Sequence, residues 1–533
     1  MIRHWRPGIV TRLVVLVAVL AMVASACSSD DDDAVGDASG ISQADLDAVS
    51  AQLADAEADV ASLEGQLASA QVTTQVVQAG ELAPAQFDTI VPGDGWANEE
   101  SVRGGLWLEA TFDSTGPDAW DIEASPRVYF TSESYSNDNY PDDADRFIGW
   151  HVIDAYSKVV LASANYRYDP STTITRGPHG VGVSPDGKWG YVGWSETPEG
   201  GSEQSYVGII NTRTMLLDKL LKTDAYFEGG RRSQRLHHIQ AWTHDASGEE
   251  YVVLQWGFGA NGGPHHILNP NDDNRVFRSI TFDDVRPMGH PFTTPSPDGQ
   301  YLYISMGANW LRESHAFNAG MAKFDIETGE HEVIEETGHH PIGVGHTMDG
   351  RWTYVIGGTS SNIFRIDNEI NEVVAHTSAG VAGPYGICMN WDETLAFTVG
   401  KGEGTHNRGH SVGVIDLVGR FRATRAIGPQ PIYLGGSASS IDHCSLHPDP
   451  EVNEIWVSNM NGFETIVVSL DTFKPTDWIA TPMGGDTHGM AFVWYDGGWD
   501  DGILMSDMGG PKAQSMQDMV NELGTAARAA AEG

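Results

Sequence analysis

The chain has 533 residues, 73 acidic against 31 basic residues, and a formal net charge of −42. This length exceeds what one small core needs and suits a large repeat domain with appended segments. Binding duplex nucleic acid depends on cationic neutralisation of phosphates, so the strong negative charge excludes that class of partner and indicates a solvated acidic surface. The 61 glycines and 16 tryptophans favour many short strands joined by tight turns.

Residues 1–26 have the features of a lipoprotein signal peptide, and residues 27–42 those of an acidic tether. Basic residues up to Arg12 precede a short apolar run, Leu13–Val23, and small residues then lead to Cys27. This order resembles a bacterial lipobox. It implies an extracytoplasmic protein anchored through lipid at Cys27 to the cell membrane, in the periplasm or on the outer face. Ordinary signal cleavage beside an incidental cysteine is the alternative.

Residues 43–72 carry a heptad stripe, and residues 73–104 have the composition of a linker. The stripe is formed by apolar residues in steps of three and four: Leu46, Val49, Leu53, Ala56, Val60, Leu63, Leu67 and Ala70. It predicts an N-terminal coiled-coil helix through which chains would form a homo-oligomer. A lone solvated helix is the alternative.

Residues 105–511 show a repeated phrase that predicts an all-β domain. The first copy runs from Pro178-His179-Gly180 to Asp186-Gly187, and related copies begin 45 to 59 residues apart at His238, His290, His340, Tyr385, His443 and His488. Each copy is an apolar alternating run followed by a turn. Seven such repeats predict a seven-bladed β-propeller.

The strand pattern also predicts how the ring closes. The first repeat divides into four strands, at His179–Ser184, Trp189–Trp194, Tyr206–Asn211 and Leu216–Leu221. Earlier strands are expected at Arg127–Ser134, Phe147–Asp154 and Lys158–Asn165, whereas only Gly502–Ser506 follows His488. We therefore expect the N-terminal strands to complete the last blade. Leu106–Phe112 leaves eight blades open as an alternative, and residues 512–533 are expected to form an Ala-rich helical tail.

Histidines at one register of the repeat would converge, because the first strand of each propeller blade lines the central channel. The candidate metal ligands are His179, His237, His238, His290, His339, His340, His443 and His488. Imidazoles without thiolates or carboxylates suit copper or zinc. We predict a metal site that holds one or more ions of copper or zinc, with calcium as an alternative ion. Polar side chains that bind only water at the channel mouth are the metal-free alternative.

Two of these blades begin with a His-His pair. Neighbours in a strand point to opposite faces, so His238 and His340 are expected to face the channel, unless a bulge turns both members of a pair inward.

Two further residues are predicted to be catalytic. Tyr385 occupies the histidine register and could donate a hydrogen bond to a bound species. Arg235 ends the basic cluster that begins at Arg231, and it could receive an anionic substrate or a partner's acidic patch. A solvated turn is the alternative for this cluster. Cys388 and Cys444 lie on the first strands of adjacent repeats and are expected to be buried thiols; a disulfide or soft metal ligands are the alternatives.

These phrases resemble the inner strands of nitrous oxide reductases. The similarity lies in Leu236-His237-His238, Pro178-His179-Gly180 and Asp349-Gly350. It covers the propeller only, and it implies a multinuclear copper cluster held by imidazoles on the propeller axis. The C-terminal cupredoxin domain of that family has no counterpart here, so the resemblance implies an external electron donor such as a cytochrome or a cupredoxin. Thiocyanate dehydrogenases, which share the propeller and a trinuclear copper site, and lactonase-type propeller repeats are also similar.

Three functions follow from the sequence. The first is a copper oxidoreductase that reduces a small molecule, nitrous oxide, to dinitrogen. The second is copper-dependent oxidation of a small anion such as thiocyanate, which the basic cluster at Arg231–Arg235 would favour. The third is a non-catalytic, lipid-anchored propeller that binds a protein or cell-wall partner. Metal analysis separates the third function from the other two.

Overall fold

The computed structural model describes residues 88–89, 96–97, 106–134, 147–168, 173–176, 180–197, 204–223, 236–257, 262–280, 292–306, 320–402, 409–423 and 431–532. The predicted signal peptide, tether and coiled-coil segment lie outside the described residues, as do His179, His290 and Arg235. The propeller belongs to the unit Gly80–Gly533.

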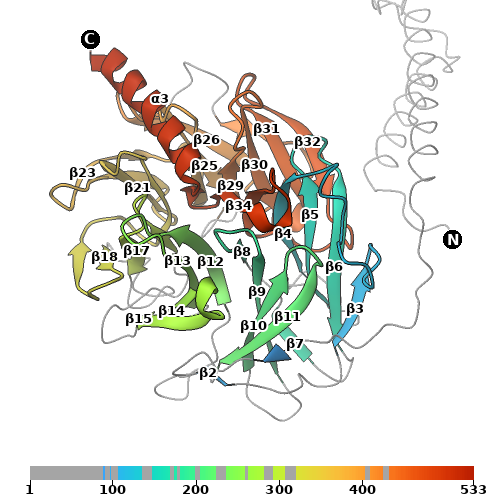
Figure 1. Ribbon diagram of the computed structural model, residues 1–533. Coiled ribbons are helices and arrows are strands. Elements are labelled where there is room, and N and C mark those ends of the chain that lie inside the picture. The colour runs from blue at the N-terminus through green and yellow to red at the C-terminus, as the bar shows by residue number, and fades with distance from the viewer. Residues whose placement is uncertain are drawn as a thin grey trace, which may run out of the picture. The chain divides into compact units, whose positions relative to one another are not determined.

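The described strands form seven blades, in which neighbouring strands are antiparallel except for β1 and β11, and this confirms the predicted seven-bladed β-propeller (Figure 1). Blade 1 contains β8 (Val181–Val183), β9 (Trp189–Thr197), β10 (Gln204–Asn211) and β11 (Leu216–Thr223), with β7 (Thr173–Arg176) on β9 and with β1 (Asp88–Thr89) and β2 (Trp96–Ala97) on β11. Blade 2 contains β12 (Leu236–Thr243), β13 (Glu250–Gly257), β14 (Gly262–Asn269) and β15 (Arg275–Ile280). Blade 3 contains β16 (Thr293–Pro295), β17 (Tyr301–Met306), β18 (Gly320–Asp325) and β19 (His331–Ile334).

Blades 4 to 6 repeat this order. Blade 4 contains β20 (Pro341–His346), β21 (Trp352–Gly357), β22 (Asn362–Asp367) and β23 (Glu372–Ser378). Blade 5 contains β24 (Pro384–Met389), β25 (Leu395–Gly400), β26 (Ser411–Asp416) and β27 (Arg422–Ala423), with β28 (Ile432–Tyr433) also on β26. Blade 6 contains β29 (Ile441–Leu446), β30 (Glu454–Asn459), β31 (Glu464–Ser469) and β32 (Lys474–Ala480). Short 3-10 turns occupy Pro270–Asp272, Met460–Gly462 and Trp499–Asp501.

Blade 7 joins the two ends of the described chain, as predicted. Its inner strand β33 (Met490–Trp494) pairs antiparallel with β4 (Arg127–Ser134), followed outward by β5 (Phe147–Asp154), β6 (Val160–Tyr168) and β3 (Leu106–Ala110). The segment proposed as an eighth blade is therefore the outermost strand of blade 7. Pairing both ends of the ring protects edges that would otherwise be exposed.

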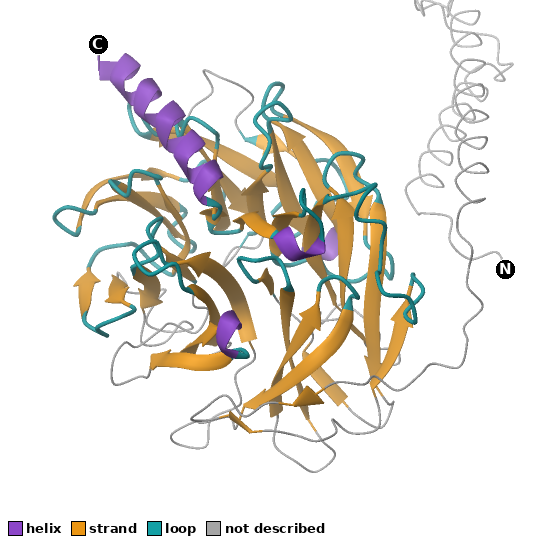
Figure 2. Ribbon diagram, in the orientation of Figure 1, coloured by secondary structure: helices purple, strands orange, loops and turns teal. Residues whose placement is uncertain are grey.

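The predicted linker and tail both contain ordered structure. The short strands β1 and β2 lie within residues 73–104 and pair with β11. The tail forms helix α3 (Gln514–Glu532), drawn purple in Figure 2, whose Met516 and Val520 are buried in the main core cluster. Within the described residues, no helix is long and apolar enough to cross a membrane.

The C-terminal segment closes the propeller channel at one end. Strand β34 (Ile503–Asp507) pairs with the channel side of β33 and is followed by β35 (Gly510–Pro511). The Ser506 hydroxyl donates to the Leu446 carbonyl oxygen of blade 6 (2.9 Å), and Lys512 Nζ lies 3.4 Å from Gln240 Oε1 of blade 2. These contacts lie toward the ends of the inner strands. In α3, the Gln517 side-chain amide also donates a hydrogen bond to the Pro297 carbonyl oxygen at the turn of blade 3 (3.3 Å).

Glu133 of β4 anchors the loop that leads back into β33. Its carboxylate accepts hydrogen bonds from the Met483 N–H and from the Ser163 hydroxyl (3.3 Å), and it lies 3.9 Å from His151 Nδ1. Burial raises the pKa of Glu133 from 4.5 to about 7, because desolvation of the charge outweighs these hydrogen bonds.

This raised pKa predicts a pH-dependent free energy of unfolding. Since the folded carboxyl binds more protons than the unfolded one between pH 4.5 and about 7, the contribution of Glu133 to stability should fall as the pH rises through this window and stay constant above it. The change should be at most about 3 kcal/mol. In thermal unfolding, the stability of the native chain relative to that of Glu133→Gln should therefore fall across this window. Because Glu250 and Glu393 also have pKa values near 7, only the difference between the two proteins reports Glu133. Equal slopes would contradict the prediction.

Candidate metal centre

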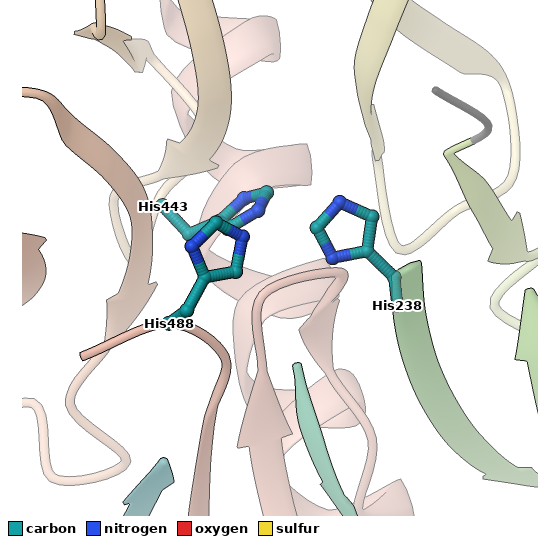
Figure 3. A group of neighbouring side chains, drawn as sticks. All are labelled: His238, His443 and His488. Atoms are coloured by element: carbon teal, nitrogen blue, oxygen red, sulfur yellow. The ribbon is translucent and has the colours of Figure 1, made fainter. Parts of the chain in front are cut away.

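Three histidines from blades 2, 6 and 7 gather on the propeller axis. His238, His443 and His488 each offer a ring nitrogen, and these atoms all lie within 4.8 Å of one another. Figure 3 shows His238 facing the other two imidazoles across the site. The ring centroids are 4.8 Å (His238–His443), 5.3 Å (His443–His488) and 5.6 Å (His238–His488) apart. All three side chains are buried.

Bulges at the start of the inner strands bring these side chains into the channel. The register shifts between Leu236 and His238 in β12 and between Ile441 and Cys444 in β29. A bulge places two residues opposite one and so breaks the alternation of side chains. The rings of His237 and His238 consequently lie together, with centroids 3.9 Å apart. Asp442 likewise reaches the site beside its neighbour His443.

Burial disfavours the protonated form of two of the imidazoles. It lowers the pKa of His443 to about 3, and that of His238 well below its ordinary value, with repulsion from the neighbouring imidazoles adding to the effect. Neutral imidazole has a lone pair on one ring nitrogen, which is the form that binds metal. Neither ring nitrogen of His443 has a hydrogen-bond partner within the described part of the chain. A buried polar atom without a hydrogen-bond partner raises the free energy of the folded state, so the site favours a further atom or ion that binds the His443 ring.

A carboxylate orients His488. Asp442 Oδ2 lies 2.6 Å from His488 Nδ1, and Asp442 Oδ1 lies 3.2 Å from the Lys401 ammonium. Burial alone would raise the pKa of Asp442, but the positive charges of His488 and Lys401 hold this pKa below its ordinary value. The carboxylate therefore stays ionised and accepts the Nδ1–H of His488, which directs Nε2 away from it. A second partner of this kind is typical of metal-bound histidine.

Tyr385 connects His237 to the three clustered histidines. Its hydroxyl lies 3.0 Å from His237 Nε2 and 3.5 Å from His238 Nε2. The Lys401 ammonium lies 3.7 Å from the centre of the Tyr385 ring, within the range of a cation–π interaction. Thus Tyr385, predicted to be catalytic, contacts the histidines, and its hydrogen bond engages the nitrogen that His237 would otherwise offer to a metal.

Two other predicted ligands among the described residues, His339 and His340, do not belong to the group of three. His340 is buried and has a positive φ of 56°, immediately before β20, and His339 precedes it. Lys401 and Asp442 were not predicted, although Asp442 forms an Asp-His pair that parallels the His-His pairs.

The two cysteines form a disulfide. Cys388 of β24 and Cys444 of β29 are bonded, with their Cα atoms 5.8 Å apart, so the expectation of buried thiols is wrong. The bond joins the inner strands that supply Tyr385 and His443. It also removes both sulfurs as soft metal ligands, because these need a thiolate.

Three imidazoles are a ligand set that suits a transition-metal ion such as copper or zinc. Nitrogens that share one ion at about 2 Å are at most about 4 Å apart, so the observed spread requires shifts below about 1 Å or a second ion. The Phe292 ring, 5.3 Å from the His238 ring, adds an apolar wall. Calcium fits poorly because it prefers oxygen ligands.

The C-terminal segment and the histidines lie toward different ends of the inner strands. The histidines stand at the start of the inner strands, whereas β34, β35 and α3 occupy the end where the Asp-Gly turns lie. A cavity of about 370 Å³ lies at that second end, between α3 and the turns of blades 2 to 4. Its lining includes Asp245, Asp298, Asp349 and Asp518, and none of the three clustered histidines.

No family profile and no curated protein matches the chain. Among solved structures, the dihydro-heme d1 dehydrogenase NirN is 14% identical, with 73% of this chain and 80% of that chain covered and a TM-score of 0.44. A 6-phosphogluconolactonase-like protein of Bacteroides fragilis is 12% identical (69% and 98% covered, TM-score 0.45). The periplasmic gluconolactonase of Pseudomonas aeruginosa is 14% identical (69% and 99% covered, TM-score 0.44). At these identities and TM-scores, none of the three assigns an activity to this chain.

Proposed function

We propose that this protein is an extracytoplasmic, copper-dependent oxidoreductase whose metal site is built on His238, His443 and His488. The observation that carries the proposal is the convergence of three buried imidazoles from three separate blades, with nitrogens within 4.8 Å of one another. Imidazole binds several divalent transition metals, and copper lies at the top of the general affinity order. Zinc is the alternative ion, since it also accepts three imidazoles.

The residues around the site have distinct tasks. Asp442 fixes the ring of His488 and directs its Nε2 to the metal. Lys401 balances the charge of Asp442, and Tyr385 holds His237 and contacts His238. The C-terminal segment excludes water from one end of the channel. Copper, when bound, would supply electron transfer to the substrate, and an external cytochrome or cupredoxin would supply the electrons.

Nitrous oxide is the substrate that we propose. Its reduction consumes two electrons and two protons and yields dinitrogen and water. The Lys401–Asp442 pair is neutral as a unit, and an uncharged substrate suits such a site better than an anion does. Oxidation of thiocyanate is the second candidate, and the carboxylate of Asp442 beside the histidines favours it, because that reaction needs an acceptor for protons from water. The basic cluster at Arg235 would then receive the anion.

The disulfide supports the proposed location. Disulfides persist in oxidising compartments, which include the periplasm and the cell surface. Together with the signal peptide, the disulfide favours export, lipid attachment at Cys27 and display outside the cytoplasm. Association of chains through residues 43–72 belongs to the same proposal. A propeller that binds a protein or cell-wall partner without catalysis would share this location but would need no metal.

The test begins with the full chain, exported, purified in the presence of copper and analysed for metal content and visible absorption. We expect bound copper and a spectrum that changes on reduction. Consumption of nitrous oxide is then followed by gas chromatography with a reduced electron donor, and oxidation of thiocyanate is followed in a parallel assay. Bound copper with turnover of thiocyanate alone would replace the first substrate by the second. A chain that binds neither copper nor zinc would leave the non-catalytic function.

A further inference from the structure

The hydroxyl of Ser132 forms hydrogen bonds with both backbone groups of His488, the N–H and the carbonyl oxygen. Ser132 lies on β4, next to the inner strand of blade 7. Its Oγ accepts the His488 N–H (2.9 Å) and donates to the His488 carbonyl oxygen (2.8 Å). The side chain is fully buried, so water does not compete for these bonds. One hydroxyl, which can donate one proton and accept others, thus satisfies both backbone groups of a candidate ligand.

The same arrangement occurs at His443. Ser458 lies on β30, the second strand of blade 6. Its Oγ accepts the His443 N–H at 3.0 Å and lies 3.5 Å from the His443 carbonyl oxygen. His443 sits in the bulge of β29, and a bulge leaves backbone groups without their usual ladder partners. The serine replaces those partners.

A third serine has this role in blade 3. Ser305 of β17 donates to the Phe292 carbonyl oxygen (2.9 Å) and accepts the Phe292 N–H (3.4 Å). The Phe292 ring lies 5.3 Å from the His238 ring and 5.7 Å from the His443 ring. All three residues held by a serine therefore belong to the metal site or to its wall.

The other described blades differ at this position. In blade 4 a backbone N–H, that of Gly358, donates to the His340 carbonyl oxygen (2.8 Å), and His340 is outside the group of three. In blade 5 the Thr398 hydroxyl donates to the Ala379 carbonyl oxygen (2.6 Å), which precedes the inner strand.

Serine hydroxyls that bond to both backbone groups of one residue thus lie beside two of the ligands and the wall of the site. At His238, the third ligand, the paired residue on the second strand is Gln255, whose amide donates to the Thr293 carbonyl oxygen instead.

We propose that Ser132 and Ser458 are positioning residues that fix the backbones of His488 and His443 so that their imidazoles share a metal. The inference rests on the proposed copper site. Metal ligands must be held to within about 0.5 Å and 10–20° of the productive geometry. A backbone tilt of about 20° would move a ring nitrogen by more than about 1 Å. A displacement of this size decides whether the imidazole nitrogens are close enough to bind the same ion.

The test compares Ser132→Ala and Ser458→Ala with a matched control. Thr398→Val is the control, because it also removes a buried hydroxyl on a second strand that donates to a backbone carbonyl oxygen. Copper affinity is measured for the full chain by titration against a competing chelator, the copper environment by electron paramagnetic resonance, and folding by thermal unfolding. Each serine variant should bind copper about 10- to 100-fold more weakly, with an altered spectrum. The control should retain the native affinity and spectrum at a comparable loss of thermal stability.

The outcomes separate the two proposals. If the native chain binds copper and both serine variants match it in affinity and spectrum, the positioning role is overturned. It is equally overturned if Thr398→Val weakens copper binding as much as they do, since the effect would then be general destabilisation. If the native chain itself binds no copper, the proposed function fails, and the serine variants are not needed to show it.

Discussion

Replacing His443 and His488 together by alanine is expected to lower copper affinity by more than about a thousandfold and to abolish redox activity. Loss of a group that hydrogen-bonds to a metal-bound histidine typically lowers metal affinity 10- to 100-fold. Loss of the histidine itself should lower affinity more than this, and here two of three histidines are removed. Only His238 of the group would remain. The measurement is metal content after dialysis against a chelator, followed by titration with copper.

His346→Ala is the matched control for this double variant. His346 is also a buried histidine on an inner strand, β20, but it bonds to the Thr353 hydroxyl (2.8 Å) and is not part of the group. We expect it to keep its copper. The propeller of the double variant should persist in circular dichroism, because the blades depend on strand pairing and apolar cores. Full copper content in the double variant would disprove the assignment of the site.

The second large effect is expected at Asp442. Substitution by asparagine removes the negative charge of Asp442 beside the Lys401 ammonium, whose side chain is only 14% exposed. Breaking a buried ion pair from one side typically costs 3–5 kcal/mol, and the slight exposure of Lys401 places the expected loss at about 3 kcal/mol. Because His488 also loses its carboxylate partner, copper affinity should fall by about 10- to 100-fold. Chemical denaturation and copper titration measure the two effects.

A double substitution distinguishes these two roles of Asp442. In Asp442→Asn with Lys401→Met, no buried charge remains unpaired, so most of the lost stability should return. Copper affinity should stay low, because His488 still lacks its carboxylate partner. If the second substitution restores affinity as well, Asp442 acts on the site only through folding.

Much of the fold could be predicted because strand patterns repeat locally. The expected strands Arg127–Ser134 and Phe147–Asp154 agree with β4 and β5 at both ends, and the shortage of strands after His488 correctly predicted that both ends of the chain share a blade. The C-terminal segment was harder to predict. Its strand β34 pairs on the channel side of β33, a position that alternation of apolar residues cannot distinguish from an outer edge.

The site was only partly predictable because its geometry depends on bulges. A bulge changes which residues face the channel, and it leaves no clear pattern in a single sequence. The His-His pair at His237 showed where two side chains turn inward, but the same event at Asp442 was missed. Lys401 follows the end of β25 and belongs to no motif. The disulfide joins Cys388 and Cys444. Cys388 is three residues after Tyr385 and Cys444 is one residue after His443, so the two cysteines occupy different positions of the repeat and the repeat pattern did not predict their pairing.

The closure of blade 7 has a consequence for the biogenesis of the protein. Ser132 and His488 are 356 residues apart in sequence, yet their hydrogen bonds form only when β4 pairs with β33. Contacts of such long range form late in folding. A chain in which β4 and β33 have not yet paired therefore lacks this support for His488, whichever other histidines have already emerged. If the proposed site binds copper, insertion of the ion would follow closure of the ring.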